Sequence, residues 1–178
     1  MRFTIRVFDK QSALDMKDSV VEVYQSVYSL QPYSESEAQV QLFSKSWKER
    51  TQKTGFLFVG ALDSNSQLVG FSYGWNSSHG DLWNTRLSNE LAEKGQKWLS
   101  DCFEFVDLAV RPSEQGFGLG RDLTKELFAI VKAETAILLT HQTTTKASEM
   151  YLRNGWIELQ KNFEVAPGKI YQVMGKVL

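Results

Sequence analysis

The feature that most constrains this chain is a glycine-rich turn between an apolar run and an amphipathic run. Residues 102–110, CFEFVDLAV, are apolar enough to form a central strand, and residues 118–132 carry leucines at helical spacing. Gly116, Gly118 and Gly120 lie at the junction. Glycine permits positive φ and a close ligand approach. The first N–H groups of a helix have no intrahelical partner. This arrangement therefore predicts an anion site, usually for phosphate.

Two common phosphate motifs do not fit this turn. A P-loop requires Lys followed by Ser or Thr after its glycines, and that pair is absent here. The dinucleotide-binding fingerprint requires a third glycine where this chain has Arg121. What fits is a Gln-x-x-Gly-x-Gly pattern from Gln115 to Gly120, after a strand that ends at Val110. An unrelated phosphate- or nucleotide-binding protein that uses only this turn is one alternative.

Composition indicates a soluble globular chain. Its 178 residues suit one domain over 1–178, with an insertion at about 76–101. Apolar residues make up 42% and charged residues 23%, and the net charge is -1. No global basic field exists, so we expect no nucleic-acid partner. No run of about 18 apolar residues predicts a membrane span, and the N-terminal sequence lacks the apolar core of a signal peptide. We expect a cytoplasmic protein.

Cysteine and histidine are scarce. The chain has one Cys, Cys102, and two His, His79 and His141. A disulfide within the chain is impossible, and we expect no metal site. Neither His lies near a nucleophile motif of the G-x-S-x-G type. Any chemistry must therefore depend on carboxylates, tyrosine, backbone amides or a bound cofactor.

Hydrophobic periodicity predicts a strand, two helices, a hairpin, the insertion, and then alternating strands and helices. This order predicts a mixed α/β (α+β) fold, in which helices cover both faces of a mostly antiparallel sheet of about six or seven strands. Gly155 is the expected C-terminal cap of the last helix. The expected strands are 2–8, 55–62, 68–75, 102–110, 135–140, 156–160 and 169–178, and the expected helices are 11–29, 35–53, 118–132 and 144–154.

Two segments resemble the GNAT superfamily of acyl-CoA-dependent N-acetyltransferases. Motif A of that family has a strand ending in an apolar triplet, then Q/R-x-x-G-x-G/A and a helix. It is matched by Leu108, Ala109, Val110, Pro112, Gln115, Gly118 and Gly120. Motif B has a strand before a helix of the form N-x-x-A-x-x-x-Y-x-x-x-G-[FW]. It is matched by Ala147, Tyr151, Gly155 and Trp156, with Thr144 in place of the usual Asn. A threonine hydroxyl there can still cap the helix or contact the ligand.

The resemblance implies a GNAT-like fold with acetyl-CoA as co-substrate in a cleft where two strands splay apart. The pyrophosphate would lie on the amides of residues 116–121, and pantetheine would pair with the edge of strand 103–110. A main-chain N–H near Leu108 or Val110 would polarise the thioester carbonyl. The implied cofactor-binding residues are Leu108, Ala109, Val110, Gln115, Gly116, Phe117, Gly118, Leu119, Gly120, Arg121, Thr144 and Ala147.

Catalysis would require one proton acceptor and one proton donor. Glu104 is the candidate base, because it lies in an apolar run that should raise its pKa. It also precedes the apolar triplet by the spacing of the catalytic glutamate in the histone-acetylating branch of the family. Asp107 is the rival, although it faces the other way in a regular strand unless a bulge intervenes. Water is the third possibility. Tyr151 matches the family tyrosine that protonates the departing thiolate.

The resemblance therefore predicts an N-acetyltransferase that transfers acetyl to a primary amine by direct attack in a ternary complex. The alternative is a catalytically silent acyl-CoA-binding or regulatory module on the same fold. The family acts on many amines, and we find no decisive acceptor code in this sequence. A homodimer is expected at the level of the family only.

Overall fold

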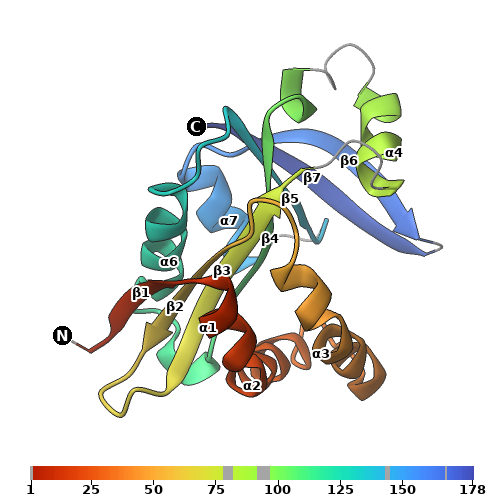
Figure 1. Ribbon diagram of the computed structural model, residues 1–178. Helices are drawn as coiled ribbons and strands as arrows, with labels where there is room; N and C mark the ends of the chain where they lie inside the picture. Colours follow the sequence, from red (N-terminus) through yellow and green to blue (C-terminus); the bar gives the residue numbers. More distant parts are fainter. Residues whose placement is uncertain (1, 78–81, 92–96, 143–144, 167) are drawn as a thin grey trace. The chain divides into compact units, whose positions relative to one another are not determined.

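The computed structural model describes residues 2–77, 82–91, 97–142, 145–166 and 168–178 (Figure 1). Strands follow the order β1-β2-β3-β4-β5-β7-β6 in one sheet. The β4–β5 pair is parallel, whereas β1–β2, β2–β3, β5–β7 and β6–β7 are antiparallel. The predicted mixed fold with a mostly antiparallel sheet is confirmed. The elements are β1 (Thr4–Phe8), α1 (Lys10–Asp15), α2 (Lys17–Tyr28), α3 (Glu37–Thr51), β2 (Leu57–Leu62), β3 (Leu68–Asn76), α4 (Leu82–Leu91), β4 (Cys102–Val110), a short 3-10 helix (Pro112–Glu114), α6 (Leu119–Phe128), β5 (Thr135–Thr140), α7 (Lys146–Arg153), β6 (Ile157–Ala166) and β7 (Lys169–Val177).

The first helical segment differs from the prediction. The sequence predicts one helix over residues 11–29, but the chain forms α1 and α2. Asp9 caps α1, because its carboxylate accepts the backbone N–H of Ser12 at 2.7 Å. Met16 ends α1 with φ -81° and ψ 8°, and α2 begins at the next residue. Hydrophobic spacing continues across this break, so the sequence pattern does not reveal it.

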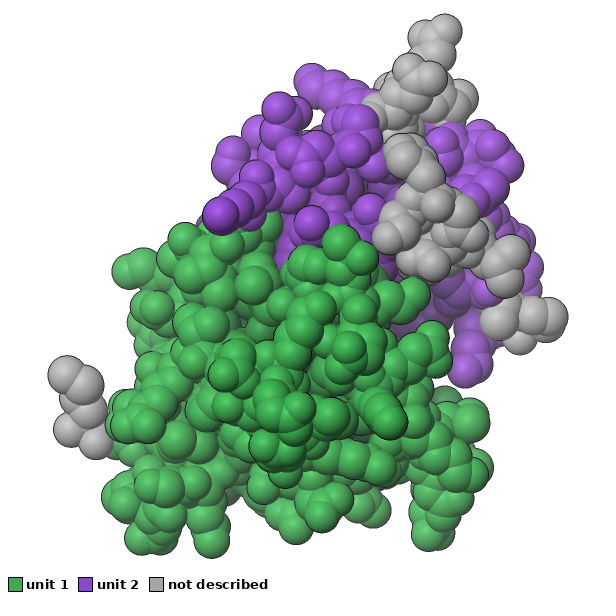
Figure 2. Space-filling model, viewed as in Figure 1, with its two compact units in different colours: residues 1–75, 107–131 green, residues 76–106, 132–178 purple. Residues whose placement is uncertain are grey.

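The chain divides into two compact units (Figure 2). Unit 1 comprises Met1–Trp75 and Asp107–Val131, and unit 2 comprises Asn76–Val106 and Lys132–Leu178. Strand β4 contributes residues to both. The predicted insertion contains α4, and residues 78–81 and 92–96 of it lie outside the described part. That residues 1–178 act as one domain stays a prediction.

In unit 1, helices lie on both faces of the strands (Figure 1). The Trp47 indole of α3 packs edge-on against Tyr73, with ring centroids 5.2 Å apart. The neighbouring Ser72 instead donates its hydroxyl to the Leu123 carbonyl of α6 at 3.2 Å. Successive strand residues point to opposite faces, so α3 and α6 cover opposite sides. Gly70 permits this packing, because a Cβ there would lie 3.2 Å from the Leu123 side chain.

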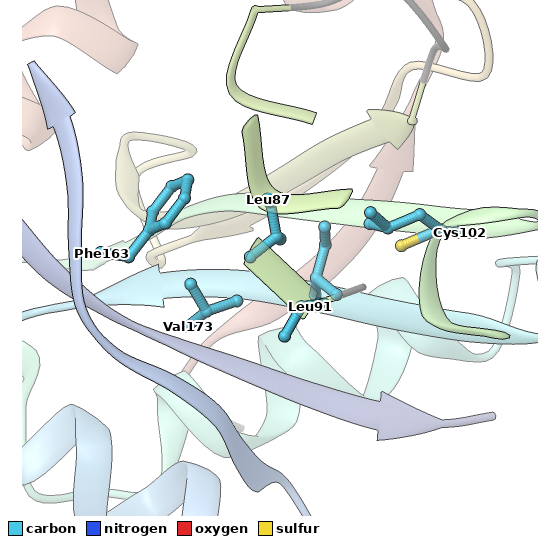
Figure 3. Packing of buried hydrophobic residues seen from close by; sticks show 7 residues of the cluster. Leu87, Leu91, Cys102, Phe163 and Val173 are labelled. Atoms are coloured by element: carbon cyan, nitrogen blue, oxygen red, sulfur yellow. The ribbon is translucent and has the colours of Figure 1, made fainter. Parts of the chain in front are cut away.

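In unit 2, α4 packs on a core that Figure 3 shows in close-up. Leu87 and Leu91 of α4 join side chains from β4, β5, β6 and β7. Helix α7 and the turn after it pack elsewhere, where Phe105 contacts the rings of Tyr151 and Trp156. The other members of the α4 core are Leu99, Cys102, Ile137, Phe163 and Val173. Because Phe105 and Cys102 are three positions apart in β4, regular alternation places them on opposite faces.

Of the helices within the described ranges, none combines the length and the apolarity that crossing a bilayer requires.

Candidate functional site

The glycine turn has the backbone geometry that the sequence predicts. Gly116 and Gly118 adopt left-handed φ of 85° and 80°. Gly118 is the N-cap of α6, and no side chain caps the helix there. Gln115 anchors the start of the turn by donating its side-chain amide to the Val110 carbonyl at 2.9 Å. Gly120 differs from its neighbours, because it lies inside the first turn of α6. The turn therefore leads into a helix N-terminus whose N–H groups receive no side-chain cap.

Cationic and aromatic side chains surround this turn. Arg121 lies over Gly118, because a Cβ at Gly118 would be 3.1 Å from the Arg121 guanidinium. Arg121 also pairs with Asp122 at 2.9 Å and remains 64% exposed. Phe117 is exposed, and the Arg2 guanidinium lies 3.9 Å from the centre of its ring. Leu119, the first residue of α6, is instead buried. The helix dipole and Arg121 together favour negative charge at this end of α6.

The apolar triplet ends β4 directly before the turn. Ala109 and Val110 are buried, and Leu108 is partly exposed. The Ala109 carbonyl would lie 3.1 Å from a Cβ on Gly70, so β3 approaches this end of β4 closely. The backbone of Arg111 continues that contact, because its N–H donates to the Val69 carbonyl at 2.8 Å. The contacts with β3 therefore fix the end of β4, where the glycine turn begins.

Glu104 lies in unit 2 and is almost fully buried, with 4% of the residue exposed. It pairs in register with Ile137 across the parallel β4–β5 ladder. Two residues earlier, burial raises the pKa of the Cys102 thiol to about 12, and the charge of Glu104 adds to that rise. The burial of Glu104 agrees with the desolvation that its apolar sequence neighbours predict for this carboxylate.

Helix α7 and the turn that follows it carry the motif B residues that the structure describes. Tyr151 is buried, and its ring meets Phe105 edge-on with centroids 6.0 Å apart. Ala147 is partly exposed in the first turn. Thr144 lies outside the described residues. The hydroxyl that caps α7 belongs to Thr145, which accepts the Ser148 N–H at 3.0 Å in a reciprocal capping box. Gly155 follows the helix with φ 82°, as a C-terminal glycine requires.

Asp107 is the centre of a polar network in unit 1. Its Oδ2 atom accepts the Tyr73 hydroxyl in a short hydrogen bond and lies 3.8 Å from Arg50 Nη1. Arg50 donates to the Tyr73 hydroxyl oxygen at 2.8 Å and to Ser46. The other carboxylate oxygen of Asp107, Oδ1, accepts the Tyr28 hydroxyl at 3.3 Å. The sequence indicates Asp107 only as a rival base and contains no signal for these partners.

Burial and charge determine the protonation of this network. Burial raises the pKa of Tyr73 well above its ordinary value, and the Asp107 charge raises it further. Burial opposes the charge on Arg50, but the Tyr73 oxygen and Asp107 more than compensate, so its pKa is also raised. Tyr73 is therefore a neutral donor and Arg50 a permanent cation. In the part of the chain that the structure describes, no group of three or more His, Cys, Asp or Glu side chains could hold a metal ion.

Comparisons with known proteins agree with this geometry. The model of the acetyltransferase (GNAT) family matches residues 18–156. A GCN5-like protein acetyltransferase of Mycobacterium tuberculosis is 25% identical over 125 residues, which are 65% of this chain and 61% of that protein. The match thus spans less than two thirds of that relative.

Two solved structures share the fold over nearly the full length of both chains. The PaiA N-acetyltransferase of Thermoplasma acidophilum, solved with coenzyme A, has a TM-score of 0.68 at 18% identity and covers 100% of each chain. YncA of Salmonella typhimurium, solved with acetyl-CoA, has a TM-score of 0.63 at 14% identity and covers 100% of this chain and 95% of its own. Together with the family match over most of the sequence, the strand–glycine turn–helix geometry leads to one conclusion: the chain belongs to the GNAT acetyltransferase family.

Proposed function

We propose that this protein transfers the acetyl group of acetyl-CoA to a primary amine by direct attack in a ternary complex. The observation that carries the proposal is the uncapped N-terminus of α6, which follows a strand and two left-handed glycines. In a GNAT family member, this helix N-terminus is the expected binding site of the acetyl-CoA pyrophosphate. The structures of PaiA with coenzyme A and YncA with acetyl-CoA support the choice of ligand.

The cofactor contacts proposed for this chain come mainly from the backbone. The amides of residues 116–121 would bind the pyrophosphate, and the exposed guanidinium of Arg121 would add a positive charge. Gln115 would hold the turn through its bond to the Val110 carbonyl. A main-chain N–H at Leu108 or Val110 would stabilise the developing oxyanion of the thioester. Phe117, Thr144 and Ala147 remain proposed contacts from the motif match.

The proposed reaction needs a proton acceptor for the ammonium and a proton donor for the departing thiolate. Glu104 would accept a proton from the ammonium, so that the amine nitrogen can attack the thioester carbonyl carbon. A C–N bond forms and the C–S bond then breaks. The departing CoA thiolate would take a proton from Tyr151, and the second proton of the attacking nitrogen would pass through water to the Tyr151 phenolate, so that the products are the acetylated amine and CoA. Asp107 and water remain the alternatives to Glu104 as the base.

Cellular location and assembly follow only as proposals. We place the protein in the cytoplasm, and the single buried Cys102 is consistent with a reducing compartment. The expected homodimer stays a prediction, which sedimentation velocity tests.

Two measurements test the function. Isothermal titration with acetyl-CoA should give a Kd on the order of 1 μM, and no binding at millimolar ligand would refute the proposal. Release of CoA with a panel of primary amines should then follow. Binding without transfer to any amine would instead indicate a silent acyl-CoA-binding module. Binding of ATP or NAD but not CoA would indicate a protein that uses only the glycine turn.

Two variants test the proton transfers. Glu104→Gln should lower turnover mainly at low pH, where the amine is most protonated and needs a base. An unchanged rate across pH would move the base to Asp107 or water. Tyr151→Phe should slow turnover with little change in acetyl-CoA affinity, because the ring packing on Phe105 is kept. An unaltered rate would remove Tyr151 from the mechanism.

A further inference from the structure

We propose that Asp107 binds the ammonium group of the acceptor amine, and that Arg50 and Tyr73 are positioning residues that fix the carboxylate for this role. The inference rests on the proposed function and concerns the side chains that select the acceptor. It depends on contacts within unit 1 alone.

The two oxygens of the Asp107 carboxylate have unequal surroundings. Oδ2 accepts the Tyr73 hydroxyl in a short bond and faces Arg50 Nη1 at 3.8 Å. Oδ1 accepts only the Tyr28 hydroxyl among the described residues, at the long distance of 3.3 Å. A carboxylate oxygen can accept two hydrogen bonds. Oδ1 therefore keeps acceptor capacity for an N–H donor.

The Tyr73 hydroxyl lies between the Arg50 guanidinium and the Asp107 carboxylate. It receives a hydrogen bond from Arg50 at 2.8 Å and donates its own to Asp107. A direct two-pronged pair would occupy both carboxylate oxygens, as arginine commonly does. The chain Arg50–Tyr73–Asp107 instead orients Oδ2 and leaves Oδ1 out of the arginine interaction. The Asp107 side chain is 15% exposed, so a ligand can reach it.

Aromatic rings stand beside Oδ1. The Tyr28 ring lies 4.3 Å from the Tyr24 ring and 4.9 Å from the Tyr33 ring, centre to centre. Tyr24 in turn stacks on Phe43 at 3.7 Å. Aromatic faces attract an organic cation, and the attraction adds to that of a carboxylate. A primary ammonium with an apolar body fits this combination better than an anionic or neutral acceptor does.

The position along β4 fits the reaction. Asp107 directly precedes Leu108, whose main-chain N–H is a proposed oxyanion donor. The Tyr28 hydroxyl also lies 3.4 Å from the Leu108 carbonyl. An amine held at Oδ1 would thus lie beside the residue proposed to bind the thioester, which is the orientation that direct attack requires.

The test measures KM for the amine separately from cofactor binding. The probe is 2-phenylethylamine, and the assay follows CoA release at saturating acetyl-CoA. Asp107→Asn keeps the shape but removes the charge, so KM for the amine should rise at least about tenfold, while the Kd of acetyl-CoA stays within about twofold. Tyr73→Phe and Tyr28→Phe should raise KM by smaller factors. Asp63→Asn is the matched control, because that carboxylate accepts two backbone N–H groups in the β2–β3 turn.

The outcomes separate the inference from the proposed function. If the wild-type protein does not acetylate 2-phenylethylamine, the acceptor class inferred here is refuted, whereas acetyl-CoA binding and transfer to another amine would leave the proposed function intact. If Asp107→Asn leaves the amine KM unchanged, or raises it no more than Asp63→Asn does, the role of Asp107 is refuted. If Asp107→Asn does not fold, the test uses Tyr73→Phe and Tyr28→Phe instead. An amine KM that is unchanged in both variants refutes the inference.

Discussion

Replacing Gly118 with alanine separates backbone strain from ligand binding at the proposed phosphate turn. Gly118 has a φ of 80°, and a side chain in this left-handed region costs about 1–2 kcal/mol. The new Cβ would lie 3.1 Å from Arg121 Nη2, at the end of a flexible and exposed side chain, so Arg121 should move and the fold should persist. For a chain of 178 residues, each kcal/mol lowers the melting temperature by about 2–4 °C.

Gly168→Ala is the matched control. Gly168 has a φ of 75°, and a Cβ there meets no atom within 4 Å, so only the backbone strain is shared with Gly118. Both variants should lose about 1–2 kcal/mol of unfolding free energy in urea, followed by tryptophan fluorescence. Only Gly118→Ala should also weaken acetyl-CoA binding, because it displaces Arg121 from the turn. Losing one hydrogen bond to a charged group raises Kd by about 10- to 100-fold.

Either of two results would contradict this prediction. If Gly118→Ala is as stable as the wild type, the left-handed turn is not strained by a side chain. If Gly118→Ala and Gly168→Ala bind acetyl-CoA as tightly as the wild type does, Arg121 and the turn do not hold the cofactor phosphates.

Three further predictions concern stability and reactivity. Thr145→Ala should lower the unfolding free energy by about 1 kcal/mol, because it removes the cap of α7, and Thr145→Ser should restore it; equal stability of all three proteins would contradict the capping role. Leu123→Ala should cost about 2–5 kcal/mol in urea unfolding, because Leu123 is fully buried on the inner face of α6, and a cost as small as that of the exposed Leu42→Ala would refute this packing. Cys102 should react slowly with iodoacetamide in the native protein and quickly in urea, because its pKa is raised to about 12. The same shift means that this thiol's contribution to stability is present below its unfolded pKa and is lost as pH rises through the folded value. Rapid labelling of the native protein would show that the thiol is exposed.

The strand, turn and helix around the glycines could be predicted because their signals are local. An apolar run, two glycines in need of positive φ and a leucine stripe are all read within about thirty neighbouring positions. The structure confirms the left-handed conformations at Gly116 and Gly118 and shows that Gly120 is helical. It also shows that Thr145 caps α7, which a pattern with three adjacent threonines leaves undecided.

The Asp107 network could not be predicted because its members come from separate elements. Tyr28 ends α2, Arg50 lies near the end of α3, and Tyr73 lies in β3. No periodicity connects these positions, and only the folded chain brings their polar atoms to one carboxylate. The break between α1 and α2 escaped prediction for a different reason. Apolar spacing on both sides of Met16 is compatible with a single helix, and the deciding bonds are made by the backbone and Asp9.

Acetyl transfer itself is the most direct test of the central claim. The purified chain is incubated with acetyl-CoA and a panel of primary amines, while CoA release and the mass of each amine product are followed. The proposed function predicts stoichiometric CoA release and the mass gain of one acetyl group on at least one amine, both dependent on the protein. Binding of acetyl-CoA with no acetylated product from any amine would contradict it.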